Sequence, residues 1–264
     1  MKLLVQENLV PGGDLAERAE RARAAGFDGL ELRDSGTARR AELAAAVAAG
    51  AWLPTVCPEM DRFIGDFDPV RREQALERIG DQLDGLAVAG GQALITSAAW
   101  GMFSRRLPPF TPPRSEEEDE ALLVDALRRL GGRAAALGVQ VLLEPLNRYE
   151  DHMVNRLARA ADLVRAAGSD AVRVLGDTYH MNIEEDDLCA ALRDAAPVLG
   201  AVHLSDSNRH QPGTGHVPFR AVVDTLRDVG FTGPLAVECR LRGEPGAALA
   251  ACGAYLRGLI EGRY

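Results

Sequence analysis

The sequence has no hydrophobic segment of the length that a membrane span needs. Apolar runs such as VLL at residues 141–143 are far shorter than the roughly 18 consecutive apolar residues that cross a bilayer. The N-terminal stretch MKLLVQENLVPGGD turns polar too early for the apolar region of a signal peptide. We therefore expect a cytoplasmic protein that does not associate with membranes.

Cysteine and positive charge are also scarce. The four cysteines form no CxxC pair and are too few to cross-link a chain of 264 residues, so we interpret them as reduced thiols with a packing role: Cys57, Cys189, Cys239 and Cys252. Lys and Arg number 30 against 39 Asp and Glu, which gives a net charge of −9. Because contacts to phosphates need clustered Lys and Arg, we expect no nucleic-acid partner.

The first apolar segment is not followed by a GxGxxG turn, and the chain carries no Walker-type phosphate loop. Instead, eight short apolar segments of the β-strand type alternate with helical patterns. They occupy residues 2–6, 29–33, 52–57, 93–98, 139–144, 172–177, 201–206 and 234–239. Nearly continuous apolar strands are typical of a parallel sheet that is buried on both faces.

Helix signals follow the strand segments. Helix starts are indicated by Asp14, by Asp68 with Pro69, by the capping-box pair Ser115 and Glu118, and by Pro218 in a first helical turn. Shorter helical patterns cover residues 37–49, 155–167 and 184–196, and a longer one covers 245–261. Eight strand–helix units without a linker predict a (β/α)8 TIM barrel of the α/β class, with residues 1–264 as a single domain.

In such a barrel the C-terminal ends of the strands line the active site. The last four segments end in ionisable residues, namely Glu144, Asp177, His203 and Glu238. Buried charges are costly, and three carboxylates with one imidazole do not neutralise one another. A divalent cation with oxygen and nitrogen ligands, such as Mn²⁺, Mg²⁺, Co²⁺ or Zn²⁺, would satisfy them. The alternative is that each residue pairs locally with an arginine or caps a helix.

A second set of polar residues follows the same strands: Glu150 in EPLNRYE, His180 in DTYH and Arg209 in HLSDSNRH. From the residues alone, four roles are open for His180. It could orient a metal ligand by a hydrogen bond, donate to a substrate, bind another metal, or belong to a surface loop. His210 and His216 have no assignable role.

The motifs LLEPLNRYE, GDTYHMNIEE, VHLSDSNRHQPGTGHVPF and LAVEC resemble those of the xylose isomerase-like TIM-barrel superfamily of sugar isomerases and epimerases. Within that superfamily they are most similar to the ketose 3-epimerases, such as D-tagatose 3-epimerase. The specific part of the resemblance lies in residues 141–240. The N-terminal half matches loosely, through GFDGLEL at 26–32.

The resemblance implies an enzyme, namely a metal-dependent isomerase or epimerase of carbohydrates. It implies that one divalent metal ion, often Mn²⁺ or Co²⁺, is bound by Glu144, Asp177, His203 and Glu238. It also implies that Glu144 and Glu238 act as the catalytic acid/base pair on opposite faces of the substrate carbon. The residues that would bind the sugar substrate are Glu150, His180 and Arg209.

A site of this kind removes a proton next to a carbonyl, and the metal stabilises the resulting enediolate. Return of the proton to the opposite face gives epimerisation, return to the neighbouring carbon gives isomerisation, and loss of a β-hydroxyl gives dehydration. A ketose 3-epimerase is the leading hypothesis, and a keto-inositol isomerase or dehydratase and a hydroxypyruvate isomerase stay open.

Two hypotheses come from other classes. An AP endonuclease resembling endonuclease IV uses the same barrel, but its three-zinc site needs histidines from the N-terminal half, whereas all five histidines here lie at position 152 or later. A non-catalytic sugar-binding barrel that retains a metal site is the other hypothesis, and the intact ligand and acid/base residues argue against it.

Two long loops, at residues 57–69 and 100–114, follow the third and fourth strand segments. Trp100, Phe103 and Phe110 would cover a sugar and exclude water, while Arg105 and Arg106 would meet an anionic group. The alternative is that these loops are simply exposed, or form a contact between copies in a homo-oligomer.

Overall fold

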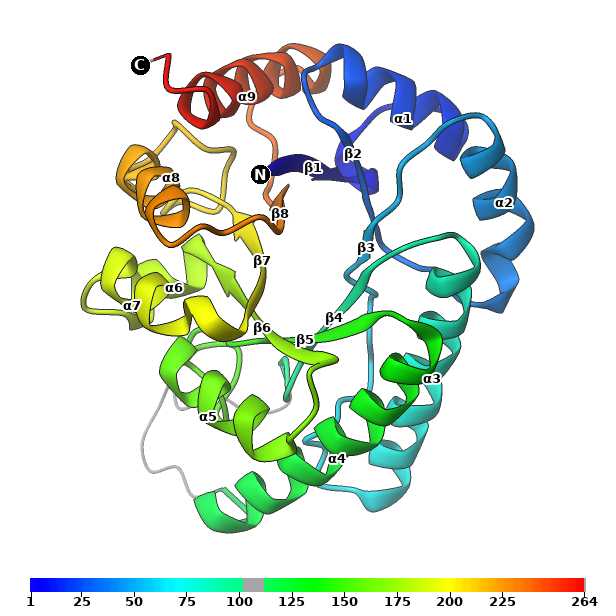
Figure 1. Cartoon of the computed structure of the whole chain (residues 1–264), viewed down its shortest axis with the longest axis vertical. Helices are drawn as coiled ribbons and strands as arrows, with labels where there is room; N and C mark the ends of the chain where they lie inside the picture. The colour runs from blue at the N-terminus through cyan, green and yellow to red at the C-terminus, as the bar shows by residue number, and fades with distance from the viewer. Residues whose placement is uncertain (102–111, 264) are drawn as a thin grey trace.

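Eight parallel strands close into a barrel, and the helices surround it (Figure 1). The computed structural model describes residues 1–101 and 112–263. The strands neighbour one another in chain order: β1 (Lys2–Gln6), β2 (Gly29–Leu32), β3 (Thr55–Val56), β4 (Ala93–Ser97), β5 (Gln140–Glu144), β6 (Val172–Asp177), β7 (Leu199–Leu204) and β8 (Pro234–Val237). The predicted (β/α)8 barrel of the α/β class is confirmed.

The helices are α1 (Leu15–Ala24), α2 (Arg40–Ala48), α3 (Pro69–Val88), α4 (Glu116–Leu137), α5 (Leu157–Ala167), α6 (Thr178–Glu184), α7 (Leu188–Ala195), α8 (Phe219–Asp228) and α9 (Pro245–Ile260), with short 3-10 helices η1 (Glu7–Leu9), η2 (Thr37–Arg39) and η3 (Ala196–Val198). Three predicted helix starts are confirmed. The Asp14 and Asp68 side chains accept hydrogen bonds from the first turns of α1 and α3, and Ser115 with Glu118 forms both bonds of a capping box on α4.

Four elements differ from the sequence prediction. Strand β3 is limited to Thr55–Val56 because Pro54 has no N–H to donate to the sheet. The helix expected at 37–49 is divided into η2 and α2. Helix α6 directly follows β6, in a segment where we predicted no helix before residue 184, and Pro218 is the N-cap of α8 rather than a residue of its first turn.

The barrel closes where the first strand meets the last. Leu3 pairs with Leu235 and Val5 with Val237 across the β1/β8 junction, and all four side chains are fully buried. Near this junction α9 lies beside α1 (Figure 1). Their close approach requires a glycine, because a Cβ on Gly253 of α9 would lie 2.0 Å from the Ala25 carbonyl oxygen.

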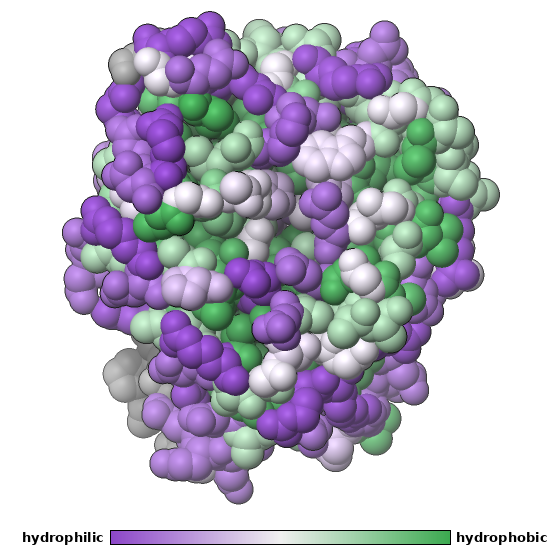
Figure 2. Space-filling view, in the orientation of Figure 1, coloured by the Kyte–Doolittle hydropathy of each residue, from purple (hydrophilic) through white to green (hydrophobic). Residues whose placement is uncertain are grey.

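Each described helix is too short or too polar to cross a membrane. On the face of the molecule that Figure 2 shows, hydrophobic side chains form small groups among hydrophilic ones rather than one continuous area. All four cysteines are free, as predicted.

Candidate functional site

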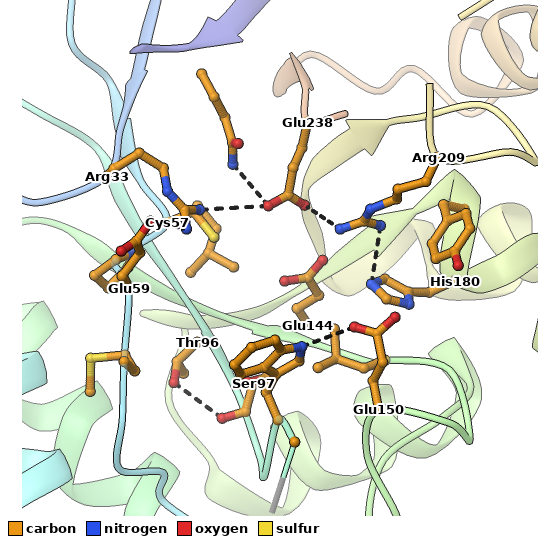
Figure 3. Close-up of a pocket in the computed structure, with 18 of the residues that line it drawn as sticks. Arg33, Cys57, Glu59, Thr96, Ser97, Glu144, Glu150, His180, Arg209 and Glu238 are labelled. Atoms are coloured by element: carbon orange, nitrogen blue, oxygen red, sulfur yellow. Dashed lines mark hydrogen bonds and ion pairs between the residues drawn. The ribbon is translucent and has the colours of Figure 1, made fainter. Parts of the chain in front are cut away.

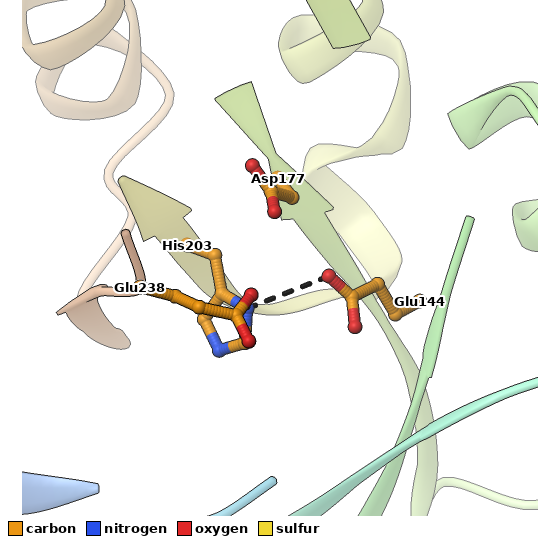
Figure 4. Close-up of side chains that lie close together, drawn as sticks. All are labelled: Glu144, Asp177, His203 and Glu238. Carbon is orange, nitrogen blue, oxygen red and sulfur yellow. Dashed lines mark ion pairs between the residues drawn. The ribbon is translucent and has the colours of Figure 1, made fainter. Parts of the chain in front are cut away.

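Four ionisable side chains point toward one another at the C-terminal end of the barrel (Figure 4). Glu144 and Asp177 are the last residues of β5 and β6, His203 lies in β7, and Glu238 directly follows β8. Each offers one ligand atom, and these atoms all lie within 4.8 Å of one another. The four residues that the sequence places at strand ends are therefore together in space.

The imidazole of His203 has two different edges. Its Nε2 lies 2.9 Å from Glu31 Oε1, while its Nδ1 lies 3.0 Å from Glu238 Oε2 and 3.4 Å from Glu144 Oε1. Despite these short ion-pair distances, neither His203 Nδ1 nor Glu144 Oε1 makes a hydrogen bond of suitable geometry with a described residue, and both atoms are buried. A divalent cation among these oxygen and nitrogen atoms would satisfy both, so the donor set fits a metal.

Glu31, in β2, is a site residue that the sequence analysis missed. Its side chain is buried and accepts hydrogen bonds from Gln6 Nε2 at 3.1 Å and Thr55 Oγ1 at 2.9 Å. The same Gln6 amide donates to Glu238 Oε1 at 2.9 Å. The only signal in the sequence is a charged residue inside the otherwise apolar strand GLEL.

Asp177 combines a local role with its place in the group. Its Oδ1 caps α6 by accepting a hydrogen bond from the Tyr179 N–H at 2.7 Å. Its Oδ2 accepts a hydrogen bond from Arg209 Nη1 at 2.8 Å. The local interactions that we considered as an alternative to metal binding are thus present, and they orient the carboxylate without removing it from the group.

The environments of the two glutamates shift their pKa values in opposite directions. Burial raises the pKa of Glu144 to about 7. Burial also acts to raise the pKa of Glu238, but the neighbouring His203 and Arg209 hold it well below its usual range. Burial disfavours the charged form of His203, yet Glu31 and Glu238 raise its pKa well above its ordinary value. Two carboxyl groups with diverging pKa values are typical of an acid/base pair.

Arg209 contacts two members of this group, Asp177 and Glu238. Besides its bond to Asp177, its Nη2 is 3.4 Å from Glu238 Oε2, and its guanidinium stacks on the Tyr179 ring at 4.6 Å. Within the described part of the chain it is the single non-glycine residue with a positive φ, at 60°. Such backbone conformations cost free energy and cluster at functional sites.

His180 and Glu150 meet at Asn147, on the loop after β5. The Asn147 N–H donates to His180 Nδ1 at 3.1 Å, and its side-chain amide donates to Glu150 Oε1 at 2.8 Å. Burial and the nearby Arg209 lower the pKa of His180 to about 3, so that its imidazole is neutral. Trp100 donates its indole N–H to Glu150 Oε2 at 2.9 Å.

These side chains line a pocket of about 920 Å³, which we call the main pocket (Figure 3). Its lining includes three residues expected to bind substrate (Glu150, His180 and Arg209), two of the candidate ligands (Glu144 and Glu238), and residues that the sequence analysis did not select, among them Gln6, Arg33, Glu59 and Tyr179. Trp100, which we expect to cover a sugar, lines it too. Phe103, Arg105, Arg106 and Phe110 lie outside the described residues.

Residues 19–257 match the family described as xylose isomerase-like TIM barrel. The chain belongs to this family. It is 40% identical over 260 residues to 3-dehydro-D-guloside 4-epimerase of Escherichia coli (strain K12), an alignment that covers 97% of this chain and 99% of that protein. It is 31% identical over 241 residues to L-ribulose 3-epimerase of Mesorhizobium japonicum, with 85% of this chain and 75% of that protein covered.

A solved structure is similar in fold and in sequence. The crystal structure of 3-keto-D-glucoside 4-epimerase from E. coli, in its apo form, superposes with a TM-score of 0.91 at 40% identity and covers 97% of this chain and 99% of its own. The protein is thus an enzyme that acts on carbohydrates, a sugar epimerase of the xylose isomerase-like family.

Proposed function

We propose that this enzyme is a divalent-metal-dependent 4-epimerase of 3-keto-hexosides, which inverts a hydroxyl-bearing carbon next to a ketone. The observation that carries the metal dependence is the group of four ligand atoms within 4.8 Å of one another. The substrate class is supported by the similarity to 3-dehydro-D-guloside 4-epimerase, which extends over nearly the whole of both chains.

Glu144, Asp177, His203 and Glu238 would hold the cation. When bound, it supplies positive charge that stabilises the negative charge developing at the ketone during proton removal. Mn²⁺ or Co²⁺ is our first choice, and Mg²⁺ or Zn²⁺ also suit carboxylate and imidazole ligands.

The two glutamates would move the proton. The Glu238 carboxylate, ionised because its pKa is low, removes the proton of the carbon next to the ketone on one face. Glu144 would return a proton to the other face of the same carbon. The two residues exchange roles in the reverse reaction.

Three further residues would bind the sugar. Glu150 offers carboxylate oxygens to substrate hydroxyls, His180 offers a neutral imidazole, and Arg209 donates from a guanidinium fixed by Asp177 and Tyr179. Each of the three lines the main pocket. Groups held in this way bind a sugar with little loss of conformational freedom.

A ketose 3-epimerase is the second candidate, favoured by the similarity to L-ribulose 3-epimerase. Both reactions exchange a proton on a hydroxyl-bearing carbon next to a ketone, so the four-residue group serves either one. They differ in the position of the ketone and in the rest of the substrate, which is a ring carrying an aglycone in one case and a short free sugar in the other.

Proton exchange in D₂O, followed by NMR, tests the proposal. Metal-loaded protein, with Mn²⁺ exchanged for Mg²⁺ before spectra are recorded, is incubated with methyl 3-keto-D-glucopyranosides, D-fructose, L-ribulose, a keto-inositol and hydroxypyruvate. We expect metal-dependent deuterium uptake at C4 of the keto-glycosides. Uptake at C3 of the free ketoses alone would favour the ketose 3-epimerase, and no uptake with any compound would refute both.

A further inference from the structure

A second pocket, which we call the outer pocket, opens beside the main pocket at the ends of β1 and β2. Its volume is about 530 Å³, within the range of about 300–1,000 Å³ that is usual for small-ligand sites. Asn8, Arg33 and Glu59 line both pockets. The two pockets are therefore adjacent, and a ligand in one can extend into the other.

Arg33 connects the outer pocket to the candidate reaction centre. One end of its guanidinium lies 3.6 Å from Glu238 Oε1, and Nη2 donates to Glu59 Oε1 at 3.3 Å. Figure 3 shows this side chain between the two carboxylates. Its Nε is buried and has no hydrogen-bond partner among the described residues. Arg33 thus forms part of the boundary between the two pockets.

The inner wall of the outer pocket is a fixed structure rather than loose surface. Glu7 is buried, with 4% of its side chain exposed, and accepts two hydrogen bonds from Arg39, at 2.6 and 2.8 Å. The backbone N–H of Arg33 also donates to Glu7, at 2.6 Å. This paired carboxylate fixes the segment after β1 against the end of β2.

The described lining of the outer pocket is polar throughout, with four arginines, three acidic residues and one asparagine. Each arginine lies near a carboxylate, for example Arg78 at 3.3 Å from Asp34 and Arg18 at 3.9 Å from Glu7. Positive charge is therefore compensated, which disfavours a phosphate or carboxylate ligand. An aromatic aglycone would find no ring to stack on here. A neutral group with many hydroxyls suits such a wall, because hydroxyls both donate and accept.

We propose that the outer pocket binds the second sugar unit of a keto-disaccharide whose ketone-bearing ring occupies the main pocket. This inference rests on the proposed function and specifies its substrate. Asn8, exposed and lining both pockets, and Arg78, on the α3 side, would donate hydrogen bonds to the hydroxyls of the second ring.

The test compares kcat/KM for C4 exchange between substrates that differ in the aglycone alone. 3-Keto-maltose and 3-keto-cellobiose are each compared with the methyl 3-keto-glucopyranoside of the same anomeric configuration, and with the phenyl glycoside. We expect at least one disaccharide to exceed its methyl glycoside by about tenfold, the effect of one added hydrogen bond to a charged group.

Two variants separate the outer pocket from the rest of the site. Arg78→Ala leaves Asp34 bonded to Gln82 and to the Gly36 N–H, and Asn8→Ala alters an exposed residue. We expect the ratio of kcat/KM for the disaccharide to that for the methyl glycoside to fall about tenfold in Arg78→Ala and by a smaller factor, about threefold, in Asn8→Ala, whose amide is uncharged. Arg133→Ala is the matched control, because Arg133 is equally exposed and paired with Asp84 at 2.8 Å, but lines neither described pocket.

Three results would overturn the inference. The first is an equal kcat/KM for the disaccharides and the methyl glycosides, the second is an equal gain for the phenyl glycoside and the disaccharide, and the third is an unchanged ratio in both variants. In all three the methyl glycosides still exchange, so the proposed function stands. Exchange with none of the glycosides would instead refute the proposed function, and the inference with it.

Discussion

The imidazole of His203 lies between Glu144 and Glu238 on its Nδ1 edge and Glu31 on its Nε2 edge. Its Nε2 faces Glu31 Oε1 at 2.9 Å, and its Nδ1 faces Glu238 Oε2 at 3.0 Å. A proton on Nε2 shared with Glu31 leaves the Nδ1 lone pair free to bind a metal. Carboxylates in this position fix the ring of a ligating histidine and make it more basic.

Glu31→Gln should therefore weaken metal binding. The amide oxygen still accepts a hydrogen bond from His203, but without negative charge it makes the imidazole a weaker ligand. We expect the affinity for Mn²⁺ or Co²⁺ to fall about tenfold, measured by isothermal titration calorimetry.

The control for this change is Glu184→Gln. Glu184 is a buried carboxylate bonded to Arg148 at 2.8 Å and lines neither described pocket. The Glu184→Gln substitution should lower the melting temperature and leave the metal affinity at the wild-type value. If Glu31→Gln behaved in the same way, Glu31 would be a residue of the core with no positioning role.

Glu238→Gln and Asp177→Asn should separate catalysis from metal binding. Both variants lose a candidate ligand charge, so both should need more metal to fill the site. At saturating metal, confirmed by elemental analysis, we expect Asp177→Asn to recover proton exchange. Glu238→Gln should remain at least about 100-fold slower than wild type, because it lacks the base. Recovery of Glu238→Gln at high metal would contradict its catalytic role.

Metal removal should destabilise the protein. A cation present at 100 times its dissociation constant adds about 2.7 kcal/mol to the free energy of unfolding. For a chain of this size that corresponds to a fall of roughly 5–10 °C in melting temperature after treatment with EDTA. Differential scanning fluorimetry measures the fall and its reversal by each added metal. A similar fall in Asp177→Asn would place the stabilising cation elsewhere.

Two cysteines should resist alkylation in the folded protein. Burial raises the pKa of Cys239 to about 12 and also raises that of Cys252, so little reactive thiolate forms at pH 8. We expect iodoacetamide to label both at least tenfold more slowly than in the unfolded chain, as measured by peptide mass spectrometry. Equal rates in the folded and unfolded protein would show that these thiols are accessible and not part of the packing.

The ligand group could be predicted because it depends on a simple geometric rule. Glu144, Asp177, His203 and Glu238 come at or near the ends of successive apolar strands, and in a parallel barrel those ends converge. Each is the ionisable residue at the end of an otherwise apolar segment, so the group can be predicted without knowing the exact register of the strands.

Other site residues depend on contacts that no local pattern encodes. Glu31 occupies the middle of GLEL, where its face of the sheet decides its role, and Gln6 reaches Glu238 across 232 positions of sequence. Arg33 gains its importance from a pocket that exists once β2 and the loop after β3 are in place. Helix α6 was missed because its seven residues are too few for a helical period to stand out.

The contact between Gln6 and Glu238 also has a consequence for biosynthesis. Gln6 leaves the ribosome 232 positions ahead of Glu238, so at about 5–20 residues per second its partner follows roughly 12–46 seconds later. Until then the edge of β1 that pairs with β8 is uncovered, and the ligand group lacks Glu238. The nascent chain therefore passes through a long interval in which the barrel is not closed, both outer edges of the growing sheet are open to misassembly, and the metal site is incomplete.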